Sequence, residues 1–225
     1  MYEVVKSCVK QCGTMSDFYD CAVGLRQGEV ISPILVSLFL QDIEAYFQSN
    51  SNTGLDIGNF TLTLLLFADD MVLFGKDPDE LQKNLDIFHS YCCKWGLEVN
   101  CSKTKIAVFR NRGNIHTHEK WFYNNNEIDI VDSFNYLGVI FNYTGSFAKN
   151  NDYVVGKALK ALSAFMYNCR SVPIRPNLLC QLFDAFVGSV LSYSADVWGF
   201  TKCKNIERVH LKFCKKLLNV RMRSS

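Results

Sequence analysis

The hydrophobic pattern changes along the chain from short runs to long helical stripes. Up to about residue 144, most apolar residues occur in short runs separated by polar turns, which is typical of strands and hairpins. From Phe147 onward, apolar residues recur every three or four positions, as on one face of a helix. The pattern predicts an α+β fold in which residues 1–144 form an antiparallel sheet with packed helices and residues 145–225 are all-helical.

Two helices are predicted within the first part. Ser32-Pro33 supplies an N-cap and a first-turn proline for a helix that runs to about Ser49. A second capping signal, Asp77-Pro78-Asp79-Glu80, precedes a helix that ends at Gly96. This second helix carries one apolar stripe, which we interpret as core: Leu81, Leu85, Phe88, Cys92 and Trp95.

Short strands account for most of the remaining pattern. Residues 1–23 are expected to hold two strands around Gln11-Cys12-Gly13. Further strands are predicted at 97–100, 104–109, 121–123, 128–131 and 136–141. In the helical part, a break at 173–176 separates the first helix from a segment at 178–193, and an amphipathic helix follows at about 203–220.

The most informative stretch is Phe67-Ala68-Asp69-Asp70, which lies where a hydrophobic hairpin is expected to turn. Apolar runs at 61–66 and 71–75 flank it. Two adjacent ionised carboxylates repel each other, and a divalent cation is the obvious compensating charge. The alternative is a solvated Asp-Asp turn, because aspartate is common in turns. The pattern alone supports both interpretations.

Charge is divided unevenly along the chain. Residues 1–144 hold 11 Lys+Arg and 18 Asp+Glu, whereas residues 145–225 hold 13 and 4. An acidic, cation-binding part joined to a basic part suits a protein that handles a polyanion with metal ions. Basic helical faces that are simply solvated give the same balance.

Composition excludes several classes of protein. With 48% hydrophobic residues the chain can bury a core and is neither disordered nor fibrous. No apolar run reaches the roughly 20 residues of a membrane span, and the N-terminus lacks a signal-peptide pattern. We therefore expect an intracellular protein, cytoplasmic or nuclear, that makes no membrane contact. Its ten scattered cysteines favour free, buried thiols, and Cys203, His210 and Cys214 have the wrong spacing for a zinc finger.

Four strings occur in the order and approximate spacing found in reverse transcriptases. They are GLRQGEVISP at 24–33, FADD at 67–70, WGLEVNCSKTK at 95–105 and FNYLG at 134–138. The chain resembles RNA-directed DNA polymerases, in particular those of non-LTR retrotransposons. The resemblance implies a palm with a primer-grip hairpin at 1–144 and a thumb with a basic C-terminal helix at 145–225.

The resemblance also implies a reaction and its partners. Such enzymes copy an RNA template by adding deoxynucleoside triphosphates to a DNA primer, through two-metal phosphoryl transfer. Asp69 matches the family's Mg²⁺ ligand, and Asp70 lies beside it. Lys103, with Lys105 as the less favoured choice, matches a lysine thought to help the leaving pyrophosphate.

Further residues match the family's binding segments. The nucleotide and template segment corresponds to Gly24, Arg26, Gln27 and Gly28, although read structurally Gly24 and Gly28 only flank a turn before a helix. The primer grip corresponds to Phe134, Tyr136, Leu137 and Gly138, of which Phe134 and Leu137 are equally suited to a core. If nucleic acid binds, its backbone would meet Lys157, Lys160, Lys204, Arg208, Lys212 and Lys215.

Two parts of the family pattern have no counterpart in residues 1–225. These are the fingers subdomain and a metal-binding aspartate upstream of the Arg-Gln-Gly segment. We therefore expect an N-terminally truncated fragment that is inactive alone and that an upstream fingers segment could complement. We also expect an unpaired strand edge and exposed apolar surface beside the Asp-Asp hairpin. The alternative function is a non-catalytic nucleic-acid-binding or interaction relic.

Overall fold

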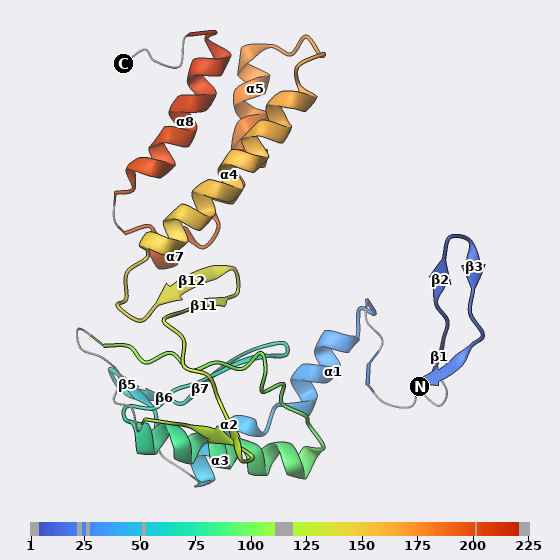
Figure 1. The fold of residues 1–225 in the computed structure, drawn as a ribbon, viewed down its shortest axis with the longest axis vertical. Helices are drawn as coiled ribbons and strands as arrows, with labels where there is room; N and C mark the ends of the chain where they lie inside the picture. Colours follow the sequence, from blue (N-terminus) through green and yellow to red (C-terminus); the bar gives the residue numbers. More distant parts are fainter. Residues whose placement is uncertain are drawn as a thin grey trace. The chain divides into compact units, whose positions relative to one another are not determined.

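A computed structural model describes residues 5–21, 24–25, 28–50, 53–110, 119–200 and 202–220 (Figure 1). The chain divides into two compact units. Unit 1 comprises residues 1–99 with 121–125, and unit 2 comprises residues 100–120 with 126–225. Strands and helices both occur, and every hairpin is antiparallel, so the predicted α+β class is confirmed.

Unit 1 contains short hairpins and three helices. Its elements are β1 (Val5–Ser7), β2 (Lys10–Gln11), β3 (Thr14–Met15), β4 (Tyr19–Cys21), α1 (Ser32–Phe39), α2 (Ile43–Asn50), β5 (Leu55–Ile57), β6 (Phe60–Leu62), β7 (Leu64–Phe67), β8 (Asp70–Leu73), α3 (Pro78–Trp95) and β9 (Phe122–Tyr123). The expected strands around residues 11–13 are β2 and β3, and β1 pairs with β4 to extend the same hairpin.

The helix predicted from Ser32 to about Ser49 is instead two helices, α1 and α2. Ser32 is the first helical residue rather than the N-cap, and no side-chain cap precedes it. The break allows α2 to bury Ile43 and Phe47, which lie one turn apart, against α3. It also places Asp42 where its carboxylate accepts a hydrogen bond from the Tyr91 hydroxyl at 2.7 Å. Burial, reinforced by this bond, raises the pKa of Tyr91.

The second predicted helix, α3, is confirmed together with its caps. Asp77 accepts a hydrogen bond from the Glu80 amide at 2.8 Å, and Gly96 ends the helix in the left-handed conformation. The predicted stripe is buried at Leu85, Phe88 and Cys92, but Leu81 is half-buried and Trp95 is 38% exposed, so the core prediction is wrong at Trp95. α3 therefore forms the core of unit 1.

The strands form separate two-stranded pairs rather than one continuous sheet in the described residues. Each strand has only two to four residues, so each pair forms a short ladder. At β7–β8, Leu65, Leu66 and Phe67 are exposed, Phe67 by 60%. Exposed apolar surface beside the Asp-Asp turn was expected from the sequence.

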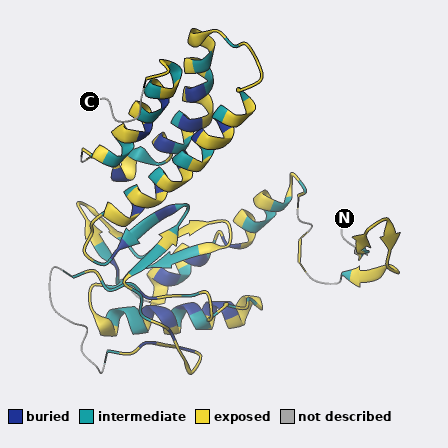
Figure 2. Ribbon diagram, turned by 45° about the horizontal axis from the view of Figure 1, so that its top comes forward, coloured by how far each residue is buried: buried dark blue, intermediate teal, exposed yellow. Residues whose placement is uncertain are grey.

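Unit 2 contains one strand hairpin followed by helices. Its elements are β10 (Asn126–Glu127), β11 (Ser133–Tyr136), β12 (Val139–Asn142), α4 (Ala148–Asn168), α5 (Pro176–Phe183), a π-helical turn (Asp184–Gly188), α6 (Ser189–Ser192), α7 (Ala195–Trp198) and α8 (Lys204–Leu217). Figure 2 shows the buried residues of these helices in dark blue. The core includes Leu162, Val187 and Val209, and Phe183 stacks on Phe213 with ring centroids 4.1 Å apart.

Several predicted strands of unit 2 are wrong. Segments 104–109 and 128–131 form only an isolated bridge between Ile106 and Ile130, and 136–141 is a hairpin whose turn lies at 137–138. Segment 97–100, at the boundary of the units, is also irregular. Asn100 explains part of this, because its side chain accepts hydrogen bonds from Ser102 and the Lys103 amide, which folds the backbone into a turn.

The prediction of free, buried thiols is confirmed in its first part and wrong in its second. All ten cysteines are free, but only Cys92 is buried, and burial raises the pKa of its thiol. In the part of the chain that the structure describes, no helix combines the length and hydrophobicity that crossing a membrane requires.

Candidate active site

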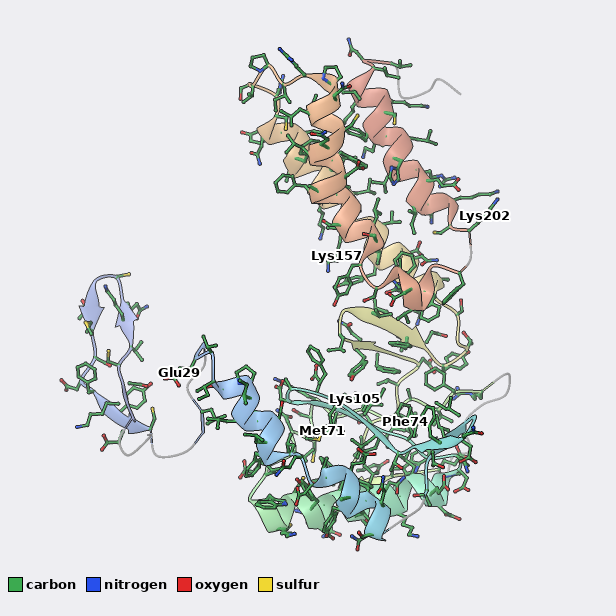
Figure 3. The ribbon with its side chains drawn as sticks, turned by 180° about the vertical axis from the view of Figure 1, so that it is seen from behind. Glu29, Met71, Phe74, Lys105, Lys157 and Lys202 are labelled. Carbon is green, nitrogen blue, oxygen red and sulfur yellow. The ribbon has the colours of Figure 1, made fainter. Side chains whose placement is uncertain are left out.

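The adjacent carboxylates occupy the turn of the β7–β8 hairpin. Phe67 pairs with Asp70, so Ala68 and Asp69 form a two-residue loop and Asp70 begins β8. Met71 and Phe74, labelled in Figure 3, follow on the same strand and just beyond it. Both aspartates are exposed. The turn predicted between two apolar strands is confirmed.

The backbone of this turn is strained at Ala68. Its φ is +53°, whereas Asp69 is not among the residues with positive φ. In a two-residue hairpin loop, this pattern is that of a type II′ turn, in which glycine is favoured at the first position. Alanine there costs roughly 1–2 kcal/mol. Such strain at a candidate site is consistent with a functional constraint on the turn.

The turn offers ligands that suit Mg²⁺. Proteins commonly bind Mg²⁺ through one or two carboxylates, with waters and substrate phosphates completing the shell. Asp69 and Asp70 match that donor set. Among the described residues, no group of three or more His, Cys, Asp or Glu side chains could hold a metal ion. A clamp for two metal ions therefore needs a carboxylate beyond this pair.

A buried asparagine ties the open end of the hairpin to α3. Asn84 is 0% exposed. Its amide nitrogen donates to the Phe74 carbonyl at 2.8 Å, and its carbonyl oxygen accepts from the Thr53 hydroxyl at 2.7 Å. The Thr63 hydroxyl donates to the Thr53 carbonyl at 2.8 Å, and the Phe74 amide donates to the Thr63 carbonyl at 2.9 Å. Both strand ends are thus fixed through one side chain.

Sequence reasoning missed Asn84, although a signal was present. Asn84 lies three residues after Leu81 and four before Phe88, so helical spacing places it on the apolar stripe of α3. A polar side chain on a buried face must find hydrogen-bond partners, which marks it as a structural link.

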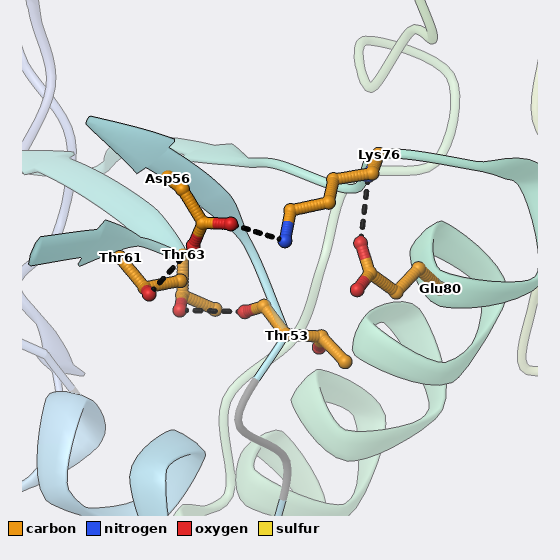
Figure 4. Close-up of polar contacts among 6 residues, drawn as sticks. All are labelled: Thr53, Asp56, Thr61, Thr63, Lys76 and Glu80. Atoms are coloured by element: carbon orange, nitrogen blue, oxygen red, sulfur yellow. Dashed lines mark hydrogen bonds and ion pairs between the residues drawn. The ribbon is translucent and has the colours of Figure 1, made fainter. Parts of the chain in front are cut away.

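An ion pair joins the end of the hairpin to the preceding strand pair (Figure 4). The Lys76 ammonium lies 2.7 Å from the Asp56 carboxylate, which also accepts from the Thr61 hydroxyl at 2.9 Å. The Lys76 hydrogen bond is the main reason that the pKa of Asp56 is lowered, and the same bond raises the pKa of Lys76. The Glu80 carboxylate accepts from the Lys76 amide at 2.7 Å.

Gly75 allows the hairpin to pass close to α3. A Cβ atom at this position would lie 2.7 Å from the Leu81 backbone nitrogen and 2.8 Å from its Cα. Only a residue without a side chain fits here unless the backbone shifts.

The predicted nucleotide and template segment is described only in part. Gly24 and Gly28 have φ of +95° and +90°, with open space around both. Conformation rather than crowding therefore calls for glycine at both positions. Arg26 and Gln27 lie outside the described residues.

The two candidate lysines have different surroundings in unit 2. Lys105 forms an ion pair with Asp129 at 2.6 Å. Lys103 is exposed, and its amide donates to the Asn100 carbonyl at 3.1 Å within the turn at 100–104. The Lys105 ammonium is therefore engaged, which supports the preference for Lys103.

The predicted primer grip is the β11–β12 hairpin. Tyr136 pairs with Val139, so Leu137 and Gly138 form a two-residue loop, and their φ values are +47° and +81°. Phe134 stacks on Phe141 with ring centroids 5.4 Å apart, so it also packs as a core residue would. The Tyr193 hydroxyl donates to the Leu137 carbonyl at 2.9 Å. The role of Tyr193 at this turn was missed by sequence reasoning.

The predicted backbone-binding cations lie on α4 and α8. Lys157, labelled in Figure 3, and Lys160 are exposed on α4, and Lys157 lies 5.1 Å from the centroid of the Tyr153 ring. On α8, Lys204 and Arg208 are exposed.

An open groove of about 410 Å³ is lined by residues of α4 and α8. Val155 and Leu159 line it from α4, and Arg208, Lys212 and Lys215 line it from α8. Three of the predicted cations are therefore brought together along one groove.

Residues 2–141 match the family described as reverse transcriptase (RNA-dependent DNA polymerase). A transposon-derived protein of Caenorhabditis elegans is 32% identical over 158 residues, which cover 67% of this chain and 53% of that protein. The RNA-directed DNA polymerase from mobile element jockey of Drosophila funebris is 28% identical over 237 residues, covering 97% of this chain and 24% of that protein.

A third relative comes from a different element. The retrovirus-related Pol polyprotein from type-1 retrotransposable element R2 of Popillia japonica is 27% identical over 176 residues, covering 76% of this chain and 24% of that protein. The chain thus spans between a quarter and about half of the length of these relatives.

Proposed function

The chain belongs to the reverse transcriptase family, and we propose that it provides the carboxylate-bearing part of an RNA-directed DNA polymerase. The observation that carries the proposal is the pair Asp69 and Asp70 on the two-residue turn of an apolar β hairpin, within the segment that matches the family. We assign residues 1–144 to the palm and residues 145–225 to the thumb.

Asp69 is the proposed Mg²⁺ ligand, with Asp70 as its neighbour. Bound Mg²⁺ would activate the primer 3′-hydroxyl and neutralise charge on the leaving pyrophosphate. The tie between Asn84, Phe74 and Thr53 keeps the hairpin in place while its turn stays open to solvent. The open end of the hairpin is fixed and its turn is accessible. This combination supports a role in metal binding, because a metal site needs prepositioned ligands and room for substrate.

Other residues are assigned to the substrate and the primer. We assign Gly24, Arg26, Gln27 and Gly28 to the incoming nucleotide and template. Lys103 is assigned to the leaving pyrophosphate, supported by its exposure and by the engagement of Lys105 with Asp129.

The hairpin residues Phe134, Tyr136, Leu137 and Gly138 are assigned to the primer end. The turn at Leu137 and Gly138 is held in a defined conformation by Tyr193, as a positioning element requires.

Cations of α4 and α8 are proposed to bind the nucleic-acid backbone. Lys157, Lys160, Lys204 and Arg208 are exposed, and Arg208 shares a groove with Lys212 and Lys215. Tyr167 on α4 is 77% exposed and can stack on a base. Contacts of this kind predict binding that is indifferent to sequence. They also predict an association constant whose logarithm falls linearly with the logarithm of the salt concentration.

A second candidate function is nucleic-acid binding or partner interaction without catalysis. It is favoured by the basic surface of α4 and α8, which does not depend on the carboxylate turn. It also needs no carboxylate beyond Asp69 and Asp70.

Primer extension on an RNA template with Mg²⁺ tests these two functions. The chain is assayed alone and with a separately expressed fingers segment that carries the upstream aspartate. Asp69→Ala is the test variant, and Asp17→Ala is the control, because Asp17 is also exposed but lies in the loop between β3 and β4.

We expect extension only when the fingers segment is added, and we expect Asp69→Ala to abolish it while Asp17→Ala does not. Extension by the chain alone would contradict the expected inactivity. Absence of extension in both mixtures, with salt-dependent binding retained, would favour the non-catalytic function.

A further inference from the structure

The β11–β12 turn adopts a conformation that its sequence does not favour. Positive φ at both loop positions is the pattern of a type I′ turn, which is preferred by Asn-Gly and Asp-Gly. Gly138 satisfies the second position. Leucine at the first position is a bulky residue in the left-handed region, where a side chain is strained. Something outside the turn must therefore stabilise it.

Tyr193 makes the contacts that can supply this stabilisation. Its hydroxyl donates to the carbonyl of Leu137, the strained residue itself, at 2.9 Å. Its ring lies against Gly138, since a Cβ atom built there would be 3.1 Å from Cε1 of the tyrosine. A single side chain thus contacts both residues of the loop.

Tyr193 is itself anchored. The indole nitrogen of Trp198, which is 4% exposed, donates to the Tyr193 carbonyl at 2.9 Å. The next residue, Ser194, has a φ of +51°, which ends α6 sharply before α7. The position of Tyr193 is therefore fixed by the turn between α6 and α7.

The opposite strand of the hairpin has a second anchor on α4. The Ile140 amide donates to the side-chain oxygen of Asn150 at 3.0 Å, and Asn150 and Val139 are buried. Tyr193 differs from these residues because it is 54% exposed, so burial of its ring does not account for its place. The contacts of Tyr193 with Leu137 and Gly138 indicate that it stabilises the turn.

We infer that Tyr193 is a positioning residue that holds the Leu137-Gly138 turn in its type I′ conformation and so fixes the place of the primer end. Only the statement about the primer end rests on the proposed function. The clamp between Tyr193 and the turn is a property of unit 2 by itself.

A double-mutant cycle with Tyr193→Phe and Leu137→Asn tests the clamp. Tyr193→Phe removes the hydroxyl and keeps the ring, while Leu137→Asn installs the Asn-Gly pair that favours this turn without help. We expect Tyr193→Phe to speed amide exchange at Tyr136 and Val139 about fivefold, the effect of losing one hydrogen bond. The double variant should return to within about twofold of the parent.

The matched control is Tyr167→Phe, which removes an exposed hydroxyl from α4 and should leave exchange at the hairpin unchanged. Unchanged exchange at Tyr136 and Val139 in Tyr193→Phe would overturn the clamp. Failure of Leu137→Asn to restore slow exchange would also overturn it, because the hydroxyl would then act on something other than the strained turn.

Binding of a fluorescently labelled RNA template annealed to a DNA primer tests whether the clamp positions the primer end. We expect Tyr193→Phe to weaken affinity about fivefold. Faster exchange with unchanged affinity would overturn the role in positioning the primer while leaving the clamp established. Absence of binding by the parent chain would overturn the proposed function, and the exchange experiment would still decide the clamp.

Discussion

The β7–β8 and β11–β12 hairpins have the same loop length but are held at different places. Each has a two-residue loop whose first residue is not glycine yet has positive φ, Ala68 in one and Leu137 in the other. The first is tied at its open end, through Asn84, and its turn is exposed. The second is tied at its turn, through Tyr193.

The difference corresponds to what each turn is proposed to do. A turn that carries two carboxylates must leave room for a cation, waters and phosphates, so its stabilising contacts lie away from the turn. A turn that locates a primer end must itself be held in place. Strain is thus tolerated in both hairpins, and among the described residues a neighbouring side chain, Tyr193, directly supports the second turn.

The largest stability difference is expected between Asn84 and Asn150, which are both 0% exposed. Asn84→Ala leaves the Phe74 carbonyl without its donor and the Thr53 hydroxyl without its acceptor, which should cost about 3 kcal/mol in the free energy of unfolding. Asn150→Ala should cost about 1–2 kcal/mol, because Asn150 accepts one bond from Ile140 and its buried amide nitrogen has no hydrogen-bond partner among the described residues. Denaturant unfolding measures both losses of free energy. Equal losses would contradict the larger contribution to stability that we propose for the hydrogen bonds of Asn84.

Gly75→Ala tests the close passage of the first hairpin beside α3. The new methyl group would press on the Leu81 backbone, so we expect a loss of about 2 kcal/mol in the free energy of unfolding. Gly156→Ala, in α4, is the matched control, because a Cβ atom there meets nothing within 4 Å and its φ is not positive. A cost no greater at Gly75 than at Gly156 would show that the contact with α3 relaxes freely.

Ala68→Gly should stabilise the carboxylate hairpin. Glycine is favoured at a first loop position with positive φ, so the free energy of unfolding should rise by about 1 kcal/mol. Ala164→Gly, at an exposed position inside α4, should lower it by a similar amount. A loss of stability in Ala68→Gly would show that the turn is not strained at this residue.

The smallest effect is expected at the exposed ion pair of Asp56 with Lys76. The pKa of Asp56 is lowered in the folded chain, so its contribution to stability is present above the unfolded pKa of about 4 and is lost as the pH falls through the folded value. Lys76→Met should return the pKa of Asp56 toward its ordinary value, as measured by NMR titration. Lys83→Met, on α3, should leave it unchanged.

The sequence predicted the parts of this comparison that local patterns determine. The Asp-Asp turn follows from two flanking apolar runs, and α3 follows from its caps and stripe. The division of the helix at 32–49 and the loss of strands at 104–109 and 128–131 depend on partners far along the chain, such as Tyr91 for Asp42. Local propensity does not contain that information.

The supporting residues were harder to predict than the site itself. Asn84 could have been found as a polar residue on a buried helical face. Tyr193 could not, because its contact with Leu137 joins residues 56 positions apart and depends on the conformation of a turn. Acidic motifs can be predicted from the sequence because their residues are adjacent along the chain. The residues that hold such motifs in place depend on long-range contacts, which only the tertiary structure reveals.

Paramagnetic broadening by Mn²⁺ tests most directly whether the exposed turn of the first hairpin is the metal-binding turn. Mn²⁺ favours the same carboxylate and water ligands as Mg²⁺, and NMR reports the residues that lie near it. We predict selective broadening of the amides of Phe67 to Met71, its loss in Asp69→Ala and its retention in Asp17→Ala. Broadening that survives in Asp69→Ala, or that is lost in Asp17→Ala, would contradict the account.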